Sequence, residues 1–321
     1  MEVGSVDTEI LFTKLEFNTG EFPEGILAEA VDQHGSIIPL LLEELRRAAA
    51  DPEALSNKGG SYIRHIYAMY MLAQFREAAA YPLLVDFVST PGEIVMELTG
   101  DVVTEDLGRM LASICYGDLG PIKRLIEDPE VNEWVRSAAL DALVDLYVEG
   151  QLEREYIIDY LQELFLFKAE RKPSYVWSAM VNTACDLYAE ELIEEIQRAY
   201  GEGLVNPGDI GFDDVKRTLA KGKEKRLEDT RRYHKGLIGN VIDEMSWWAC
   251  CCCWSKTAAI CVCRSNADRN GRSHPRSMRS YGCDGGIVAL RSLPAGAGFK
   301  PPRAALAEDR CRERRGLRRI H

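Results

Sequence analysis

Apolar residues recur at intervals of three and four positions along almost all of the first 250 residues of the chain. This spacing places them on one face of an α-helix, whereas a half-buried strand would show an apolar residue at every second position. Alternating runs of that kind are absent from this part of the sequence. The pattern predicts an all-α fold.

One helix-forming stretch carries a stripe of small residues. In VRSAALDALVDL, Ala138, Ala139 and Ala142 recur at helical spacing beside Leu143 and Leu146. Small side chains let a neighbouring helix approach closely, so the stripe is typical of helices that stack on one another.

Similar stretches predict that this unit repeats. Their first helices begin near Ile63, Leu107, Val135 and Val176, at intervals of 44, 28 and 41 residues. Two of these intervals fall in the range of roughly 40–47 residues that HEAT and armadillo repeats show, and the middle one is shorter. Each first helix is followed by a second amphipathic stretch, so each unit is expected to be a helical hairpin.

The predicted architecture is therefore a HEAT- or armadillo-like α-solenoid of helical hairpins over residues 1–250. We expect an N-terminal helix pair at about 21–52, with Pro23 near a helix start and Gly35 after a helix end. The repeats are expected at about 60–205. A single charged, solvated helix at about 212–245 is expected to close the solenoid.

The two parts of the chain differ in charge. Residues 246–321 hold 15 Lys and Arg against 5 Asp and Glu, which leaves 24 basic and 46 acidic residues in residues 1–245, which we call the body. Nucleic-acid affinity comes mainly from Lys and Arg that neutralise phosphates, so nucleic acid is an unlikely partner for the acidic body.

Cysteine usage and the first residues of the chain favour a cytoplasmic protein. Only Cys115 and Cys185 lie in the body, each within an apolar helical pattern, as expected of buried reduced thiols. The opening residues lack the basic start and apolar run of a signal peptide. No stretch reaches the ~18 apolar residues of a membrane span, so no membrane association is expected.

The stretch 251–321 changes character and is expected to be an irregular or disordered tail. It is rich in Arg, Cys, Ala, Gly and Ser and shows no sustained helical or strand period, a mixture that GC-rich coding sequence gives when translated out of frame. Our hypothesis is a frameshift near Cys250. A zinc site and a basic nucleic-acid-binding tail are the alternatives, although four adjacent cysteines lack the usual C-x-x-C spacing. The zinc alternative would use Cys250, Cys251, Cys252, Cys253, Cys261, Cys263 and His274.

The segment ELTGDVVTEDLGR is the most polar patch of the body. Several carboxylates this close could share a hard divalent cation or exchange protons with a substrate. The alternative interpretation is a helix start, with Thr104 as the N-cap and two acidic residues in the first turn. The candidate acidic patch comprises Glu97, Asp101, Glu105, Asp106 and Arg109.

A second set of candidates lies at the starts of the first helices, where aromatic residues sit beside Arg and His. Aromatic side chains next to Arg are common anchors of protein interfaces. Arg residues at such helix starts can instead pair with a carboxylate of the next repeat, and Asp101 or Asp128 could serve. The candidate interaction surface comprises Arg64, His65, Trp134, Arg136, Tyr175 and Trp177.

Four strings of the body resemble one bacterial family, called domain of unknown function eleven eighty-six. They are HIYAMYMLAQFREAAAYPLL, the long run from ELTGDVV to SAALDAL, PSYVWSAM and VIDEMSWWAC. The resemblance covers about residues 5–250 and implies a HEAT-like helical protein with no known reaction. Some members end in a zinc-binding SEC-C motif, which cannot be placed on any residue of this chain because the sequence departs from the pattern after Cys250.

No phosphate loop, nucleophile elbow, HExxH or dinucleotide fingerprint is present, so no catalytic residue, metal ligand or cofactor is assigned. We expect a non-enzymatic interaction scaffold that binds a protein or peptide. The alternative is a metal-dependent enzyme or sensor that uses the acidic patch.

Overall fold

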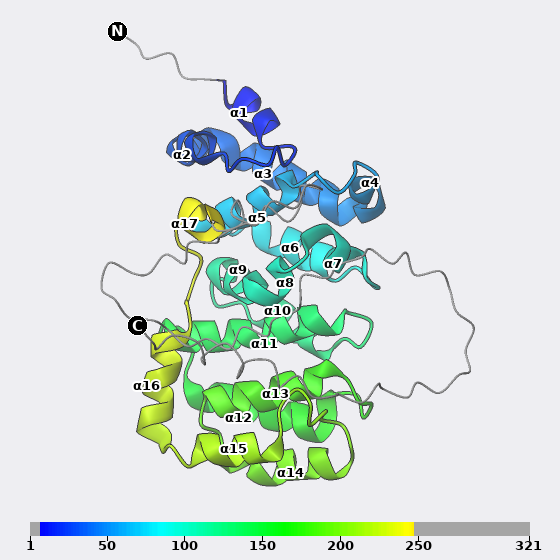
Figure 1. Cartoon of the computed structure of the whole chain (residues 1–321), viewed down its shortest axis with the longest axis vertical. Coiled ribbons are helices and arrows are strands. Elements are labelled where there is room, and N and C mark those ends of the chain that lie inside the picture. The colour runs from blue at the N-terminus through cyan, green and yellow to red at the C-terminus, as the bar shows by residue number, and fades with distance from the viewer. Residues whose placement is uncertain (1–6, 247–321) are drawn as a thin grey trace, which may run out of the picture. The chain divides into compact units, whose positions relative to one another are not determined.

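A computed structural model describes residues 7–246, and within that range the chain is helical with no strand (Figure 1). The predicted all-α class is confirmed. The predicted tail, including the cysteines from Cys250 onward and His274, lies outside the described residues. The helices of the N-terminal half are α1 (Thr8–Lys14), α2 (Glu24–Asp32), α3 (His34–Ala50), α4 (Pro52–Ser56), α5 (Arg64–Gln74), α6 (Ala80–Val88), α7 (Ile94–Thr99), α8 (Val102–Glu105), α9 (Leu107–Ile114) and α10 (Gly120–Glu127).

The second half continues the helical pattern as far as the last described residue. A π-helical turn, Leu164–Lys168, extends α12, and a short 3-10 turn, Glu190–Leu192, precedes α14. The helices are α11 (Glu133–Val148), α12 (Arg154–Glu163), α13 (Tyr175–Asp186), α14 (Ile193–Gly201), α15 (Phe212–Leu219), α16 (Lys223–Tyr233) and α17 (Val241–Met245).

Four helix pairs make up the middle of the body: α5 with α6, α9 with α10, α11 with α12, and α13 with α14, with the short helices α7 and α8 between the first two pairs. Their first helices begin within two residues of Ile63, Leu107, Val135 and Val176, the positions that the apolar pattern marks. Helices α5 and α9 are buried almost all round, since every residue of Arg64–Ala73 and of Leu107–Ile114 is buried, as expected of helices in the middle of the stack.

Each first helix ends in the same kind of turn. The residue two positions beyond it has a left-handed backbone, with φ of 55° at Arg76, 48° at Tyr116, 67° at Gly150 and 50° at Tyr188. In three of the turns the next amide donates back to the carbonyl five residues earlier, as Glu77 does to Leu72. This is the Schellman arrangement, which satisfies the last helical carbonyls and reverses the chain. The shared turn marks the four pairs as structurally equivalent.

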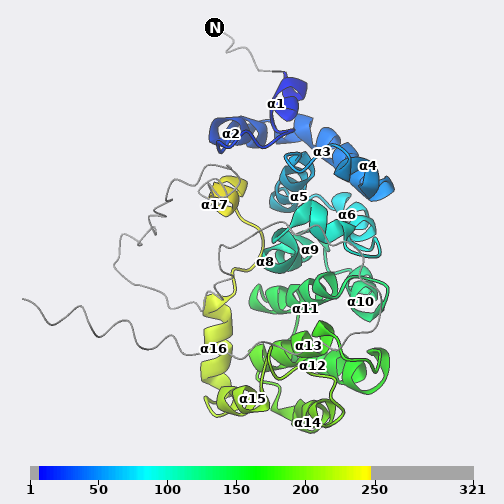
Figure 2. The ribbon, with the colours of Figure 1, turned by 45° about the vertical axis from the view of Figure 1, so that its right-hand side comes forward.

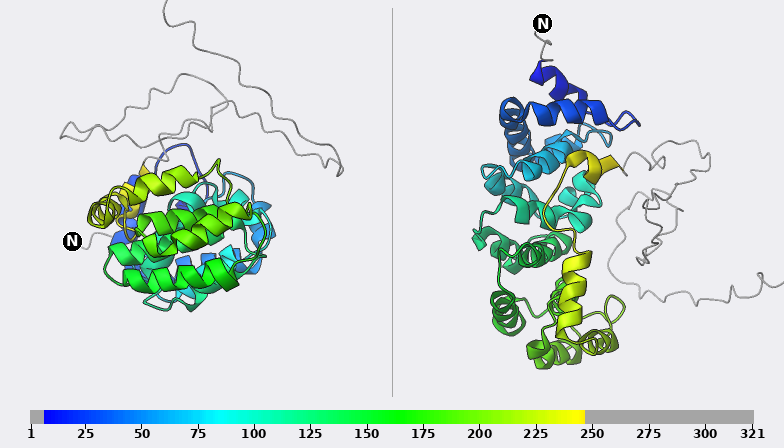
Figure 3. Two further views of the ribbon diagram at one scale, coloured as in Figure 1. Left: turned by 90° about the horizontal axis from the view of Figure 1, so that it is seen from below. Right: turned by 90° about the vertical axis from the view of Figure 1, so that its left-hand side faces the viewer.

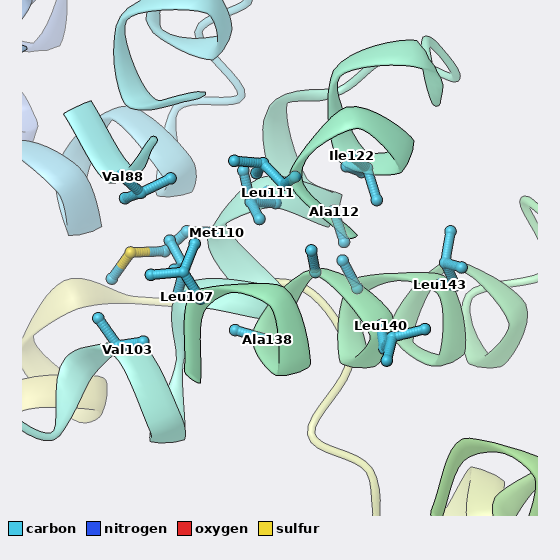
Figure 4. Packing of buried hydrophobic residues seen from close by; sticks show 14 of the residues in the cluster. Val88, Val103, Leu107, Met110, Leu111, Ala112, Ile122, Ala138, Leu140 and Leu143 are labelled. Atoms are coloured by element: carbon cyan, nitrogen blue, oxygen red, sulfur yellow. The ribbon is translucent and has the colours of Figure 1, made fainter. Parts of the chain in front are cut away.

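Helix α3 packs on α5 and α6, and the first helices then pack on one another in chain order, α5 on α9, α9 on α11 and α11 on α13, while the second helices flank them (Figures 1 and 2). The contact between α9 and α11 is the most extensive. A Cβ on Gly108 would lie 2.7 Å from the carbonyl oxygen of Ala138, so this pair needs glycine at that point. Leu107, Leu111, Ala138 and Leu140 complete the packing (Figure 4).

Two expectations for the N-terminal pair come out differently. Pro23 is the N-cap of α2, as its fixed φ suits a helix start. Gly35 does not follow a helix end, because α2 already ends at Asp32 and Gly35 lies in the first turn of α3. Gln33 alone separates the two helices.

The expectation of one charged closing helix at 212–245 is wrong. The region forms α15, α16 and α17, which are separated at Gly222 (φ 83°) and at the extended stretch that contains Gly236 (φ 68°). Positive φ is readily adopted by glycine and interrupts a helix. The end of this region is also not a solvated cap, because α17 packs against α2 and α5, and Val241 and Met245 are buried (Figure 3).

Among residues 7–246, no helix combines the length and the apolar character that crossing a membrane requires.

Candidate functional site

A row of buried polar residues follows the stacked first helices. Tyr70 lies in α5, Asp106 and Arg109 at the start of α9, and Asp145 in α11. Each is no more than 6% exposed. Burying a charge is costly unless it is paired and hydrogen-bonded, so the partners of these residues indicate what this face holds.

Arg109 engages two carboxylates and two main-chain carbonyls. Its Nη1 donates to Asp106 Oδ1 at 2.7 Å, and Nη1 and Nη2 donate to the two Glu244 carboxylate oxygens at 2.8 and 2.6 Å. Its Nε donates to the carbonyl of Gly236 at 2.8 Å, and Nη2 to that of Leu237 at 3.0 Å. A guanidinium group matches this planar set of acceptors. Arg109 therefore fastens the last described segment of the chain to α9.

We call residues 235–246 the strap. Three further hydrogen bonds hold its main chain: Arg76 Nη2 donates to the carbonyl of Ile238 at 2.8 Å, the amide of Ile238 donates to Ser113 Oγ at 2.9 Å, and that of Val241 to Gln74 Oε1 at 2.8 Å. Gln74, Arg76, Arg109 and Ser113 together form what we call the strap face. The side chains of this face bond mainly to main-chain atoms of the strap.

Asp106 is kept ionised by its hydrogen bonds. Burial favours the neutral form, but donation from Tyr70 Oη at 2.6 Å and from Arg109 outweighs it and holds the pKa of Asp106 below its usual value. Lys235 of the strap lies 3.4 Å away and adds to the effect. Asp106 therefore acts as a fixed acceptor that orients Arg109.

His234 joins the end of α16 to two first helices. Its Nδ1 lies 3.3 Å from Asp145 Oδ1 in α11, and its Nε2 lies 3.6 Å from Asp186 Oδ2 in α13. Burial alone would lower the pKa of His234, but the two carboxylates raise it to about 10. An imidazolium with carboxylates on both sides pins the chain just before the strap.

Asp141 lies one helical turn before Asp145 in α11, and the pKa values of both carboxyls are raised. Burial, together with the charges of Asp145 and Asp186, raises the pKa of Asp141 to about 7. A proton acceptor is therefore present, but the described part of the chain places no reactive nucleophile with it. Burial raises the pKa of the Cys115 thiol and brings that of Cys185 to about 12, so both thiols stay protonated.

The five residues of the candidate acidic patch do not form one site. Glu97, Asp101 and Glu105 are exposed, whereas Asp106 and Arg109 are buried in the strap contact. The helix-start interpretation also fails in detail, because Thr104 lies inside α8, where its hydroxyl donates to the carbonyl of Asp101, and α9 begins only after Asp106. Within residues 7–246, no group of three or more His, Cys, Asp or Glu is arranged to hold a metal ion.

Four of the six candidate interaction residues are buried. Arg64 pairs with Glu44 at 3.1 Å, Arg136 donates to the carbonyl of Ile126 at 3.0 Å, and Trp177 Nε1 donates to that of Glu170 at 3.1 Å. His65 is 0% exposed, with Nε2 lying 2.8 Å from the Leu98 carbonyl. These residues hold the stack together and present little surface to a partner.

Trp134 and Tyr175 are partly exposed and lie against each other, with ring centroids 4.1 Å apart. Trp134 and Arg136 line an open depression of about 320 Å³ beside the turns that precede α11 and α13. Arg136 pairs at 3.4 Å with Glu170, which lies in the turn before α13. The expected pairing of an Arg with a carboxylate of the next repeat therefore occurs here, but the partner is neither Asp101 nor Asp128.

Sequence reasoning missed Glu244, Asp145 and His234. Asp141 and Asp145 lie four residues apart in the otherwise apolar stretch 138–147 of α11, and this was the available local signal of a buried polar row. No local signal marks Glu244, because its partner Arg109 lies 135 positions earlier.

Comparison with known proteins gives a family and two relatives. The family described as "Protein of unknown function (DUF1186)" matches residues 6–252. An uncharacterized protein of Chlamydia trachomatis serovar D is 36% identical over 234 residues, which cover 73% of this chain and 92% of the relative. An uncharacterized protein of Chlamydia muridarum is 35% identical over 234 residues, with 73% and 93% covered. No solved structure matches the chain.

Proposed function

The chain belongs to the bacterial family of unknown function DUF1186, and we propose that it is a non-enzymatic protein-interaction scaffold built from HEAT-like helix pairs. The observation that best supports this function is the strap face, which holds the main chain of an extended segment through the side chains of Gln74, Arg76, Arg109 and Ser113. Main-chain hydrogen bonds combined with a few side-chain anchors are a general way to bind an extended peptide.

Repetition supports the HEAT-like reading. Four helix pairs end their first helices in equivalent left-handed turns, and first helix packs on first helix throughout. Stacked helix pairs create an extended surface that spans several repeats, which suits a protein or peptide partner. The acidic balance of the body favours such a partner over nucleic acid.

The proposal includes a cytoplasmic location. Cys115 and Cys185 are buried, unpaired thiols, as is usual in a reducing compartment.

Isolation of the full chain from bacterial cells under native conditions tests the proposal. We expect a specific partner protein in near-stoichiometric amount. Calorimetric titration with magnesium, calcium, manganese and zinc tests the alternative, a metal-dependent enzyme or sensor using the exposed carboxylates Glu97, Asp101 and Glu105. The scaffold proposal is overturned if no partner is recovered and a hydrolase screen gives turnover that Asp101→Ala abolishes.

A further inference from the structure

The strap is bound to the body chiefly through its backbone. The face donates to the carbonyls of Gly236, Leu237 and Ile238 and accepts from the amides of Ile238 and Val241. Every amino acid except proline offers these groups, so this part of the contact does not depend on the side chains of the strap. The face is therefore able to hold other extended segments in the same way.

Only a few side chains of the strap add selectivity. Ile238, Val241 and Met245 are 1%, 0% and 2% exposed, so three apolar anchors are buried at fixed spacing. Glu244 supplies the carboxylate for Arg109.

Gly236 adds a backbone requirement. Its φ of 68° lies in the left-handed region that favours glycine, and a Cβ here would meet the end of the exposed Glu149 side chain, which can move aside. The face thus fits a glycine, then apolar residues two, five and nine positions later, with a carboxylate eight positions after the glycine.

The strap has little structure of its own to preserve. Helix α17 has five residues, fewer than an isolated helix needs to be stable in water. In the extended part, the hydrogen bonds described above go to side chains of α9 and of the turn beyond α5. Segments held in this way open locally at lower free energy than the helical core.

We propose that the strap is a ligand bound in cis, and that a partner protein displaces it with an extended segment of the same pattern: glycine, spaced apolar residues and a carboxylate for Arg109. This inference rests on the proposed scaffold function and adds the chemistry of the partner and a means of regulation. The strap keeps the face covered until a matching segment competes for it.

The test uses the full chain and a labelled synthetic peptide with the sequence of residues 234–246, HKGLIGNVIDEMS. Fluorescence anisotropy compares the wild-type chain, Glu244→Gln, and the control Glu228→Gln, which alters an exposed carboxylate of α16. Glu244→Gln weakens the cis strap by removing a charge-assisted pair. We expect this chain to bind the peptide roughly tenfold more tightly than the wild-type chain or the control. A peptide that carries the same Gln should bind roughly tenfold more weakly.

Hydrogen exchange provides a second readout on the same variants. The amides of Ile238 and Val241 should exchange roughly tenfold faster in Glu244→Gln, while those of α11 stay unchanged. The inference is overturned if these amides exchange only together with α11, or if no chain binds the peptide. If the chain binds the peptide but native isolation recovers no partner, the scaffold proposal fails and the displacement of the strap is still supported. If native isolation recovers a partner but the chain does not bind the peptide, the scaffold proposal is supported and the displacement of the strap is overturned.

Discussion

Arg109 Nη2 in α9 lies 2.6 Å from Glu244 Oε1, and this ion pair joins positions that are 135 residues apart. Asp106 shares the same guanidinium at 2.7 Å. The pair is therefore part of a buried network in which one guanidinium binds two carboxylates, while Lys235 lies 3.4 Å from Asp106. Removal of the guanidinium takes away the cation that Glu244 pairs with and leaves Asp106 with Tyr70 and Lys235.

Arg109→Leu should be strongly destabilising. Breaking a buried charge network by removing one partner costs about 3–5 kcal/mol. Urea unfolding of the full chain measures the loss. The control Arg46→Leu alters an exposed ion pair with Glu43 and should leave the free energy of unfolding within error. Equal effects of the two variants would show that the Arg109 network is not structural.

Gly108→Ala should separate α9 from α11. The added Cβ meets backbone atoms of α11 at 2.7 and 3.1 Å, which side-chain rotation cannot relieve. Overpacking of this kind costs about 1–3 kcal/mol. Gly201→Ala is the control, because nothing lies within 4 Å of that position in α14, and it should be neutral or stabilising. Thermal unfolding of both variants distinguishes them, and a stable Gly108→Ala protein would argue against the close helix contact.

Asp141→Asn should stabilise the protein in a pH-dependent way. Burial and the charges of Asp145 and Asp186 raise the folded-state pKa of Asp141 to about 7 from its ordinary value of 3.8. Below the lower value both states are protonated and the substitution gives no gain. Between the two values only the unfolded state ionises, so the gain should grow by up to about 1.4 kcal/mol per pH unit and level off above pH 7. Denaturant titrations from pH 4 to 8 measure it.

The exposed residue Asp159 supplies the control for that series. Asp159→Asn replaces an exposed carboxyl and should change the free energy of unfolding by no more than about 0.5 kcal/mol. A gain for Asp141→Asn that did not change with pH would mean that burial does not disfavour the Asp141 charge.

Cys115 and Cys185 should resist alkylation in the folded protein. Both are buried, and burial raises their thiol pKa values, so little thiolate is present. Iodoacetamide treatment at pH 8 followed by peptide mapping should leave these two residues unmodified, and denaturant should expose them. Rapid native labelling of Cys185 would contradict its place in the core.

The helical class and the starts of the paired helices could be read from the sequence because each depends on local spacing. Ala138 and Ala142 share one face of one helix, so their pattern is visible within twelve residues. The helix at Leu107 was the poorest match, since α9 has eight residues and Gly108 occupies a packing position.

The strap could not be predicted in the same way. Its position depends on Arg109, Arg76 and Gln74 meeting main-chain atoms more than 125 residues later, and no periodic pattern encodes such contacts. The candidate interaction surface included Arg64 and Arg136, with pairing to a carboxylate of the next repeat as the alternative. Both are buried, where Arg64 pairs with Glu44 and Arg136 donates to the carbonyl of Ile126, and residue type alone does not identify these partners.

Photo-crosslinking in cells tests most directly whether a partner protein binds the body at the strap face. A photo-crosslinking amino acid is placed in the full chain at Tyr233, which is 48% exposed beside the strap, or at Tyr156, which is 41% exposed on α12. If the partner binds at the strap face, position 233 should give a covalent adduct with a partner protein and position 156 should give none. Adducts from position 156 alone, or from neither position, would contradict a scaffold that binds its partner at the strap face.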